Sequence, residues 1–159
     1  MSTAKSTFYL LPGRLRIPGS VFVLLGTVVL FIRFYFGIKP EWLELKVFAI
    51  YSAYLDVKYI TVIQNQLIEE IGGLFLLGGL YMIAFSKEKK ETSVTNSARL
   101  QAFMISIWIN AVLMVLSLLF IYGLGFAFMM MISSLFFLVT YIVTFRIQIH
   151  KHKRSHYNN

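Results

Sequence analysis

The sequence contains no cysteine. This absence excludes disulfides, thiol nucleophiles and thiolate metal sites such as the zinc ribbon, and it leaves the redox compartment open. Histidine is also scarce, and all three histidines lie after position 149. No apolar segment therefore offers the imidazole that usually ligates haem iron inside a membrane. We expect neither a cofactor nor a metal site.

Charge is missing from one long stretch, which runs from Leu100 to Phe145. A helix that crosses about 30 Å of hydrocarbon needs about 20 residues, so these 46 uncharged residues suffice for two crossings. Gly123 and Gly125 lie near the centre, where the chain must turn. With 58% hydrophobic residues, the chain is predicted to be a polytopic membrane protein. The predicted spans here are 100–122 and 125–145.

Two further apolar segments, 18–38 and 67–86, predict two more spans. The first follows three basic residues, as in a signal sequence, but no small-residue cleavage site comes after it, and its length suits a full span. We therefore interpret it as an uncleaved anchor. The expected fold is an all-α membrane protein, with residues 1–159 forming one polytopic domain of four transmembrane helices.

The distribution of Lys and Arg predicts the topology. Eleven of these residues lie before the first span, in the connection 87–99 or in the tail 146–159, and only three lie in the connection 39–66. Basic residues accumulate on the cytoplasmic side of a membrane protein, so both termini are expected in the cytoplasm. The expected location of the protein is the inner membrane. The net charge of +8 is assigned to topology and anionic lipid, and nucleic acid is not expected as a partner.

The outer connection 39–66 is too apolar for a loose loop. Its β-branched and aromatic residues favour a small β-hairpin, with Asp56 as the turn residue. The competing interpretation is an amphipathic helix in the membrane interface, with Trp42 at headgroup depth.

Polar residues form one stripe on each of the last two predicted helices. At 100° per residue, the members of a stripe fall close together on one face, and a fold-back near residue 124 would match the two stripes in depth. The stripes consist of Ser106, Asn110 and Ser117, and of Ser133, Thr140 and Thr144. Interhelical packing, with Asn110 bonded across the seam, is one explanation, and a polar path through an oligomer is the other.

Small residues recur at seven-residue spacing in the first two spans. They are Gly19 and Gly26 in the first, and Gly72, Gly79 and Ser86 in the second. This spacing stays in line only when helices supercoil to the left, so a left-handed bundle is predicted.

Arg33 is the one charged residue clearly inside a span, near the outer end of the first. An unpaired charge there would be costly, and Glu69 and Glu70 begin the second span on the same side. We expect Arg33 either to pair with one of them or to extend its charge to the interface, and a functional role as a gate or ligand contact is the alternative.

The tail combines histidines with basic residues. His150, His152 and His156 could attract a metal, but Arg146, Lys151, Lys153 and Arg154 surround them and repel cations. We interpret the four basic residues as a segment that contacts anionic lipid headgroups.

Three short segments carry a resemblance: Glu69 to Gly73, Ala84 to Lys89, and Phe120 to Gly123. Together they resemble a group of small four-span bacterial membrane proteins without an established function, over residues 40 to 146. The resemblance implies a four-span layout with an outward-facing connection, and it implies no catalytic residues.

No set of residues in the predicted spans is a candidate catalytic site, because the spans contain no paired carboxylates, no acid at mid-depth and no serine beside a base. The first hypothesis is a non-enzymatic scaffold, sensor or partner subunit of a membrane complex, as a homo-oligomer or with a protein partner. The alternative is an oligomeric pore-forming, transport or lytic, holin-like protein.

Overall fold

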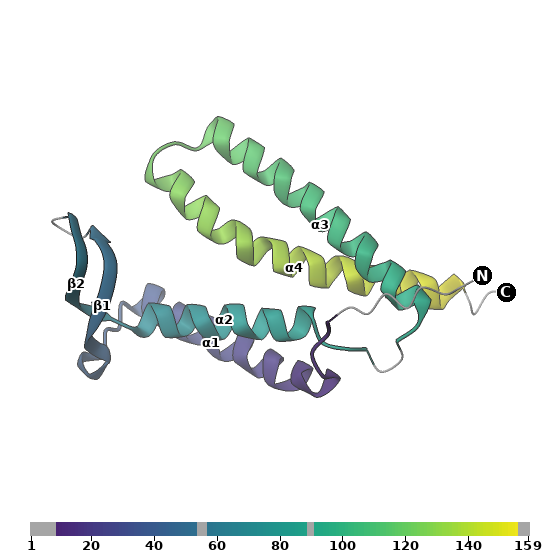
Figure 1. Ribbon diagram of the computed structural model, residues 1–159, viewed down its shortest axis with the longest axis horizontal. Helices are drawn as coiled ribbons and strands as arrows, with labels where there is room; N and C mark the ends of the chain where they lie inside the picture. Colours follow the sequence, from purple (N-terminus) through teal and green to yellow (C-terminus); the bar gives the residue numbers. More distant parts are fainter. Residues whose placement is uncertain (1–8, 54–56, 89–90, 156–159) are drawn as a thin grey trace. The chain divides into compact units, whose positions relative to one another are not determined.

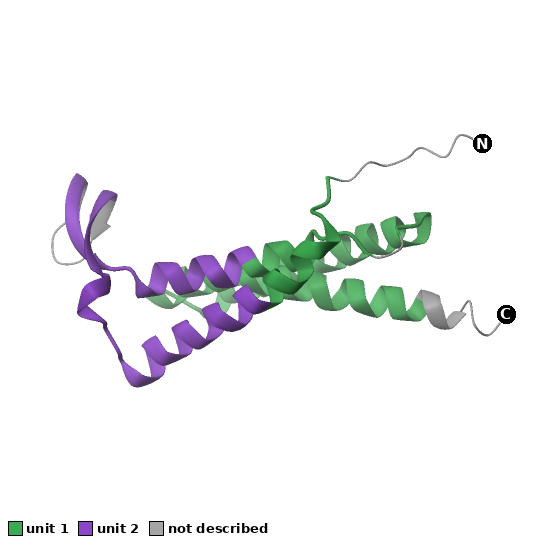
Figure 2. Cartoon of the chain, turned by 90° about the horizontal axis from the view of Figure 1, so that it is seen from below, with its two compact units in different colours: residues 1–20, 79–159 green, residues 21–78 purple. Residues whose placement is uncertain are grey.

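The computed structural model describes residues 9–53, 57–88 and 91–155. The chain divides into two compact units, Met1–Ser20 with Gly79–Asn159 as unit 1 and Val21–Gly78 as unit 2 (Figure 2). The boundary between the units cuts through two helices, so each end of those helices is described with its own unit.

The described residues are mostly helical, with one small hairpin (Figure 1). The α-helices are α1 (Arg16–Phe36), α2 (Ile68–Ala84), α3 (Ser93–Phe120) and α4 (Leu124–Ser155), and η1 (Gly13–Leu15) is a short 3-10 turn before α1. Three segments are long and apolar enough to cross a membrane: Gly13–Phe36, Ser93–Phe120 and Leu124–Lys151. The mostly helical, membrane-type fold is thereby confirmed. The 17-residue α2 is not among these three segments, so a fourth span is not shown.

Two helix ends lie outside the predicted spans. The predicted connection 87–99 is too long, because α3 already begins at Ser93, where the side chain of Thr92 caps it by accepting a hydrogen bond from the Thr95 N–H at 3.3 Å. The predicted tail 146–159 is not a separate segment, because α4 continues without a break to Ser155. Both predicted spans were ended where polar residues begin. Polar residues do not end a helix, however, when its backbone hydrogen bonds continue past them.

The turn between α3 and α4 is short, and it sets their relative depth. Residues 121–123 separate the two helices, and Gly123 has a φ of 66°, in the left-handed region that glycine adopts without strain. The reversal is therefore centred at residue 122 and not at 124. In agreement, the Phe103 ring lies 6.2 Å from the Tyr141 ring and 5.7 Å from the Phe137 ring. Because the reversal lies two residues earlier than expected, the polar stripes of α3 and α4 are not matched in depth at the positions that we predicted.

The outer connection contains the predicted β-hairpin. Strands β1 (Glu44–Ala53) and β2 (Val57–Gln66) pair antiparallel, with Val47 opposite Ile63. The alternative of an interfacial helix is wrong, because the segment forms two paired strands, in which its β-branched and aromatic residues are favoured. Trp42 lies in the 3-10 turn η2 (Glu41–Leu43) that precedes β1. The expected turn residue, Asp56, lies outside the described residues.

Helices α1 and α2 approach closely at small residues. In unit 2, a Cβ placed on Gly26 would lie 2.6 Å from the Leu76 nitrogen and 2.8 Å from the Gly72 oxygen. In unit 1, a Cβ on Gly19 would lie 3.1 Å from the Gly79 oxygen. The seven-residue spacing thus marks the face along which these backbones meet, as close helix packing requires.

Candidate functional sites

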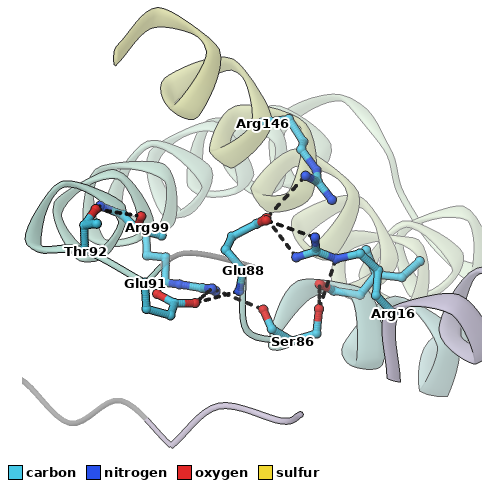
Figure 3. Close-up of polar contacts among 9 residues, drawn as sticks. Arg16, Ser86, Glu88, Glu91, Thr92, Arg99 and Arg146 are labelled. Atoms are coloured by element: carbon cyan, nitrogen blue, oxygen red, sulfur yellow. Dashed lines mark hydrogen bonds and ion pairs between the residues drawn. The ribbon is translucent and has the colours of Figure 1, made fainter. Parts of the chain in front are cut away.

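Unit 1 contains a cluster of charged side chains that join four segments distant in the sequence (Figure 3). Arg16 begins α1, and Arg99 and Arg146 lie on α3 and α4. The other members come from the connection between α2 and α3. We call Arg16, Ser86, Glu88, Glu91, Arg99 and Arg146 the arginine–glutamate cluster.

Glu88 accepts hydrogen bonds from two arginines. Arg16 donates from both terminal nitrogens, at 3.0 Å to Oε2 and 2.8 Å to Oε1, which is the bidentate geometry favoured by guanidinium and carboxylate groups. Arg146 Nη1 donates to Oε1 at 3.2 Å. Burial raises the pKa of Glu88, but the hydrogen bond and charge of Arg16, with the charges of Arg146 and Arg99, outweigh it and hold that pKa below its usual range.

Arg99 is almost fully buried, with 3% of its surface exposed. Its Nη2 donates to Glu91 Oε1 at 2.8 Å and to the Ser86 carbonyl at 3.1 Å. Its guanidinium carbon lies 4.6 Å from the centre of the Phe145 ring, within the range of a cation–π contact. Nε and Nη1 of Arg99 have no hydrogen-bond partner among the described residues.

Backbone contacts hold the segment before α1 against the same connection. Leu11 forms a parallel bridge with Ser86, in which the Leu11 N–H donates to the Phe85 carbonyl and the Lys87 N–H donates to the Leu11 carbonyl, both at 2.9 Å. Arg16 Nε donates to Ser86 Oγ at 3.2 Å. The described residues just before α1 are therefore held against the connection between α2 and α3.

Sequence reasoning missed most of this cluster. It counted Arg16 and Arg99 only among the basic residues that set the topology, and it assigned no role to Glu88 or Glu91. One signal was available, because Arg16, Arg99 and Arg146 each lie within two residues of the end of a predicted span. If those ends share one depth, the three arginines must lie at the same level.

A second group of charged residues lies in unit 2. Arg33 Nη2 lies 2.7 Å from Glu69 Oε1, and the Arg33 side chain is 15% exposed. Glu70 instead accepts a hydrogen bond from the Asn65 side chain at 2.6 Å, which ties the base of the hairpin to the start of α2.

The polar stripes are buried in part. Ser106, Ser117 and Ser133 are buried, and each hydroxyl donates to a carbonyl three or four residues back in its own helix, at 2.7 to 2.8 Å. Thr140 and Thr144 are half-buried. The Oδ1 atom of Asn110 is buried without a hydrogen-bond partner among the described residues, which differs from the bond across the seam that we expected.

The tail residues lie on the last turns of α4. Lys151 is exposed, and His150 Nδ1 lies 3.0 Å from the Arg146 carbonyl oxygen. The side chains of His152, Lys153 and Arg154, and all of His156, lie outside what the structure describes. Within the described ranges, no group of three or more His, Cys, Asp or Glu side chains could hold a metal ion.

Comparisons with protein-family models, with curated proteins and with solved structures gave no match.

Proposed function

We propose that this chain is a non-enzymatic integral membrane protein that acts as a scaffold, sensor or partner subunit through its outer hairpin. In this proposal the protein crosses the inner membrane four times as a left-handed bundle, with both termini in the cytoplasm. The charge asymmetry and the three long apolar helices support this insertion.

Helix α2 is proposed as the fourth span. Its 17 residues rise about 25 Å, which reaches the lower end of the length that crosses a bilayer. Its uncharged part after Glu70 packs against α1 at Gly26 and Gly72, and Glu69 pairs with Arg33 at the proposed outer end. These contacts support a helix that accompanies α1 through the membrane.

The observation that carries the proposal is the exposed apolar face of the hairpin. Alternate strand residues share a face, and one face of this sheet presents three large apolar side chains. They are Phe48 (67% exposed), Ile50 (73%) and Val62 (61%). The described sheet has only two strands, so the outer edges of β1 and β2 also lack a neighbouring strand. An apolar face with open edges is typical of a contact surface.

Photocrosslinking in living cells tests the proposal. A crosslinking amino acid at Phe48 or Ile50 should give a discrete protein adduct, whereas the same group at Leu118, an exposed residue of the apolar α3, should give lipid adducts. Lipid adducts alone at all three positions would contradict the proposal. Alkaline phosphatase fused after Asn65 should be active and after Glu91 inactive, and the reverse pattern would overturn the topology.

One observation favours the alternative of a pore or transport unit. The buried Oδ1 of Asn110 lacks a partner among the described residues, and a second copy could supply one. The serine hydroxyls weigh against this alternative, because they are buried and bonded within their own helices. Ion flux from liposomes separates the two: a pore predicts flux that falls in Asn110→Leu and Thr140→Val, and the scaffold predicts no flux.

A further inference from the structure

The arginine–glutamate cluster has a surplus of positive charge. It contains three guanidinium groups, of Arg16, Arg99 and Arg146, and two carboxylates, of Glu88 and Glu91. Arg99 is 3% exposed, and two of its three nitrogens have no hydrogen-bond partner among the described residues. A buried charge is stable only when it is compensated, so this cluster favours one further negative group nearby.

Arg146 is the member of the cluster whose N–H groups are not all used in hydrogen bonds with the described residues. Its side chain is 42% exposed, and only its Nη1 makes a side-chain hydrogen bond with the described residues. In Figure 3 no dashed line reaches the other terminal nitrogen of Arg146. Arg16, by contrast, already uses Nε and both terminal nitrogens on Ser86 and Glu88. A ligand would therefore contact Arg146 directly, and the charges of Arg16 and Arg99 would attract it without direct contact.

The position of the cluster indicates the chemistry of the ligand. The three arginines lie within two residues of the ends of the predicted spans, at 18, 100 and 145, where lipid phosphates are found. A phosphodiester carries one negative charge, which equals the surplus, and its free oxygens fit the planar donors of arginine.

We propose that the arginine–glutamate cluster binds one phosphate group, that of an anionic phospholipid in the cytoplasmic leaflet, through the N–H groups of Arg146 that have no partner among the described residues. The inference rests on the proposed insertion, which the phosphatase fusions test separately. A soluble phosphate would offer the same chemistry, so the experiment contains an arm for each source.

The test uses the full chain purified in a neutral detergent. Native mass spectrometry counts the lipid retained after addition of phosphatidylglycerol or of phosphatidylcholine. Thermal unfolding scans with phosphatidylglycerol or with inorganic phosphate then compare stabilisation by the lipid with stabilisation by a soluble phosphate. We expect one phosphatidylglycerol to be retained in preference to phosphatidylcholine. Millimolar inorganic phosphate that stabilises as much as the lipid would assign the site to a soluble phosphate and overturn the lipid assignment.

Arg146→Gln should weaken retention of phosphatidylglycerol about tenfold, the effect of losing a charge-assisted hydrogen bond. Arg146→Lys should retain part of the affinity, because it keeps the charge but not the planar donors. Lys46→Gln is the matched control, since it removes one positive charge from an exposed position on β1, to which no lipid contact is assigned, and it should leave retention unchanged. Equal retention of both lipids by the wild type, or unchanged retention in Arg146→Gln, would overturn the proposal.

Discussion

Arg99 shows how one buried residue can depend on several different partners. A carboxylate, a carbonyl oxygen and an aromatic ring surround a guanidinium that water barely reaches. Removal of a single partner from such a charge is more damaging than removal of the whole pair, because the charge remains buried without compensation.

Glu91→Ala should therefore destabilise the protein by about 2 to 4 kcal/mol, whereas the double variant Glu91→Ala with Arg99→Met should recover most of this loss. Unfolding of the detergent-solubilised protein, followed by circular dichroism, measures both. A double variant less stable than Glu91→Ala would show that Arg99 contributes through packing and not through its pairing with Glu91.

Glu88 makes stability depend on pH. Its pKa in the folded protein lies below the ordinary value of 4.5, so its ionised form contributes stability that is present above that value and is lost as the pH falls through the lower folded pKa. The groups around it are Arg16, Arg99 and Arg146, which stay charged at these pH values, and Glu91, whose side chain bonds the Glu88 N–H.

Between pH 7 and pH 3, the unfolding temperature should fall more steeply for the wild type than for Glu88→Gln, which has no proton to gain at this position. Curves that run parallel over this range would show that Glu88 is not linked to folding. Because glutamine keeps the size of the side chain, the comparison isolates the charge.

Among the elements, two glycines allow a backbone effect to be separated from packing. A Cβ on either Gly123 or Gly73 would meet nothing within 4 Å, but only Gly123, in the turn between α3 and α4, has a positive φ, of 66°. Gly73 lies inside α2.

Gly123→Ala should destabilise by about 1 to 2 kcal/mol, because an L-residue strains in the left-handed region. Gly73→Ala should be neutral or stabilising by up to about 1 kcal/mol, because alanine loses less chain entropy in a helix. Thermal unfolding of the two variants side by side provides the measurement, and a Gly123→Ala protein as stable as wild type would exclude a conformational role for that glycine.

The elements were largely predictable from local pattern, and their ends were not. Enrichment in β-branched and aromatic residues indicated the hairpin, and apolar length indicated α1, α3 and α4. Charge was taken as the end of a helix, although Arg99 and Arg146 lie inside helices. The cap formed by Thr92, a residue type suited to this role, would have located the start of α3.

At the scale of the whole molecule, the arginine–glutamate cluster could not be predicted from any local pattern. Arg16 and Glu88 are 72 positions apart, and Arg146 and Glu88 are 58 apart, so their contacts depend on how the helix ends converge. Pairing of Arg33 with one of two adjacent glutamates was easier to anticipate, since threading alone brings those residues to one side.

Absence of cysteine allows the topology to be tested with single-cysteine variants on an unmodified background. In intact spheroplasts, a membrane-impermeant maleimide should label Phe48→Cys, whose position is exposed on the hairpin, and should not label Lys151→Cys until the membrane is permeabilised. Labelling of Lys151→Cys in intact spheroplasts would place the end of α4 outside and refute the proposed insertion.

The uninterrupted length of α4 has a mechanical consequence. Its 32 residues form a rod about 48 Å long, so in the proposed insertion roughly a third of it would extend beyond a hydrocarbon layer about 30 Å thick. A continuous helix resists a sharp bend, because a sharp bend breaks backbone hydrogen bonds of the helix. If α4 tilted or rotated within the bilayer, its basic last turns would therefore move together with the rest of the helix.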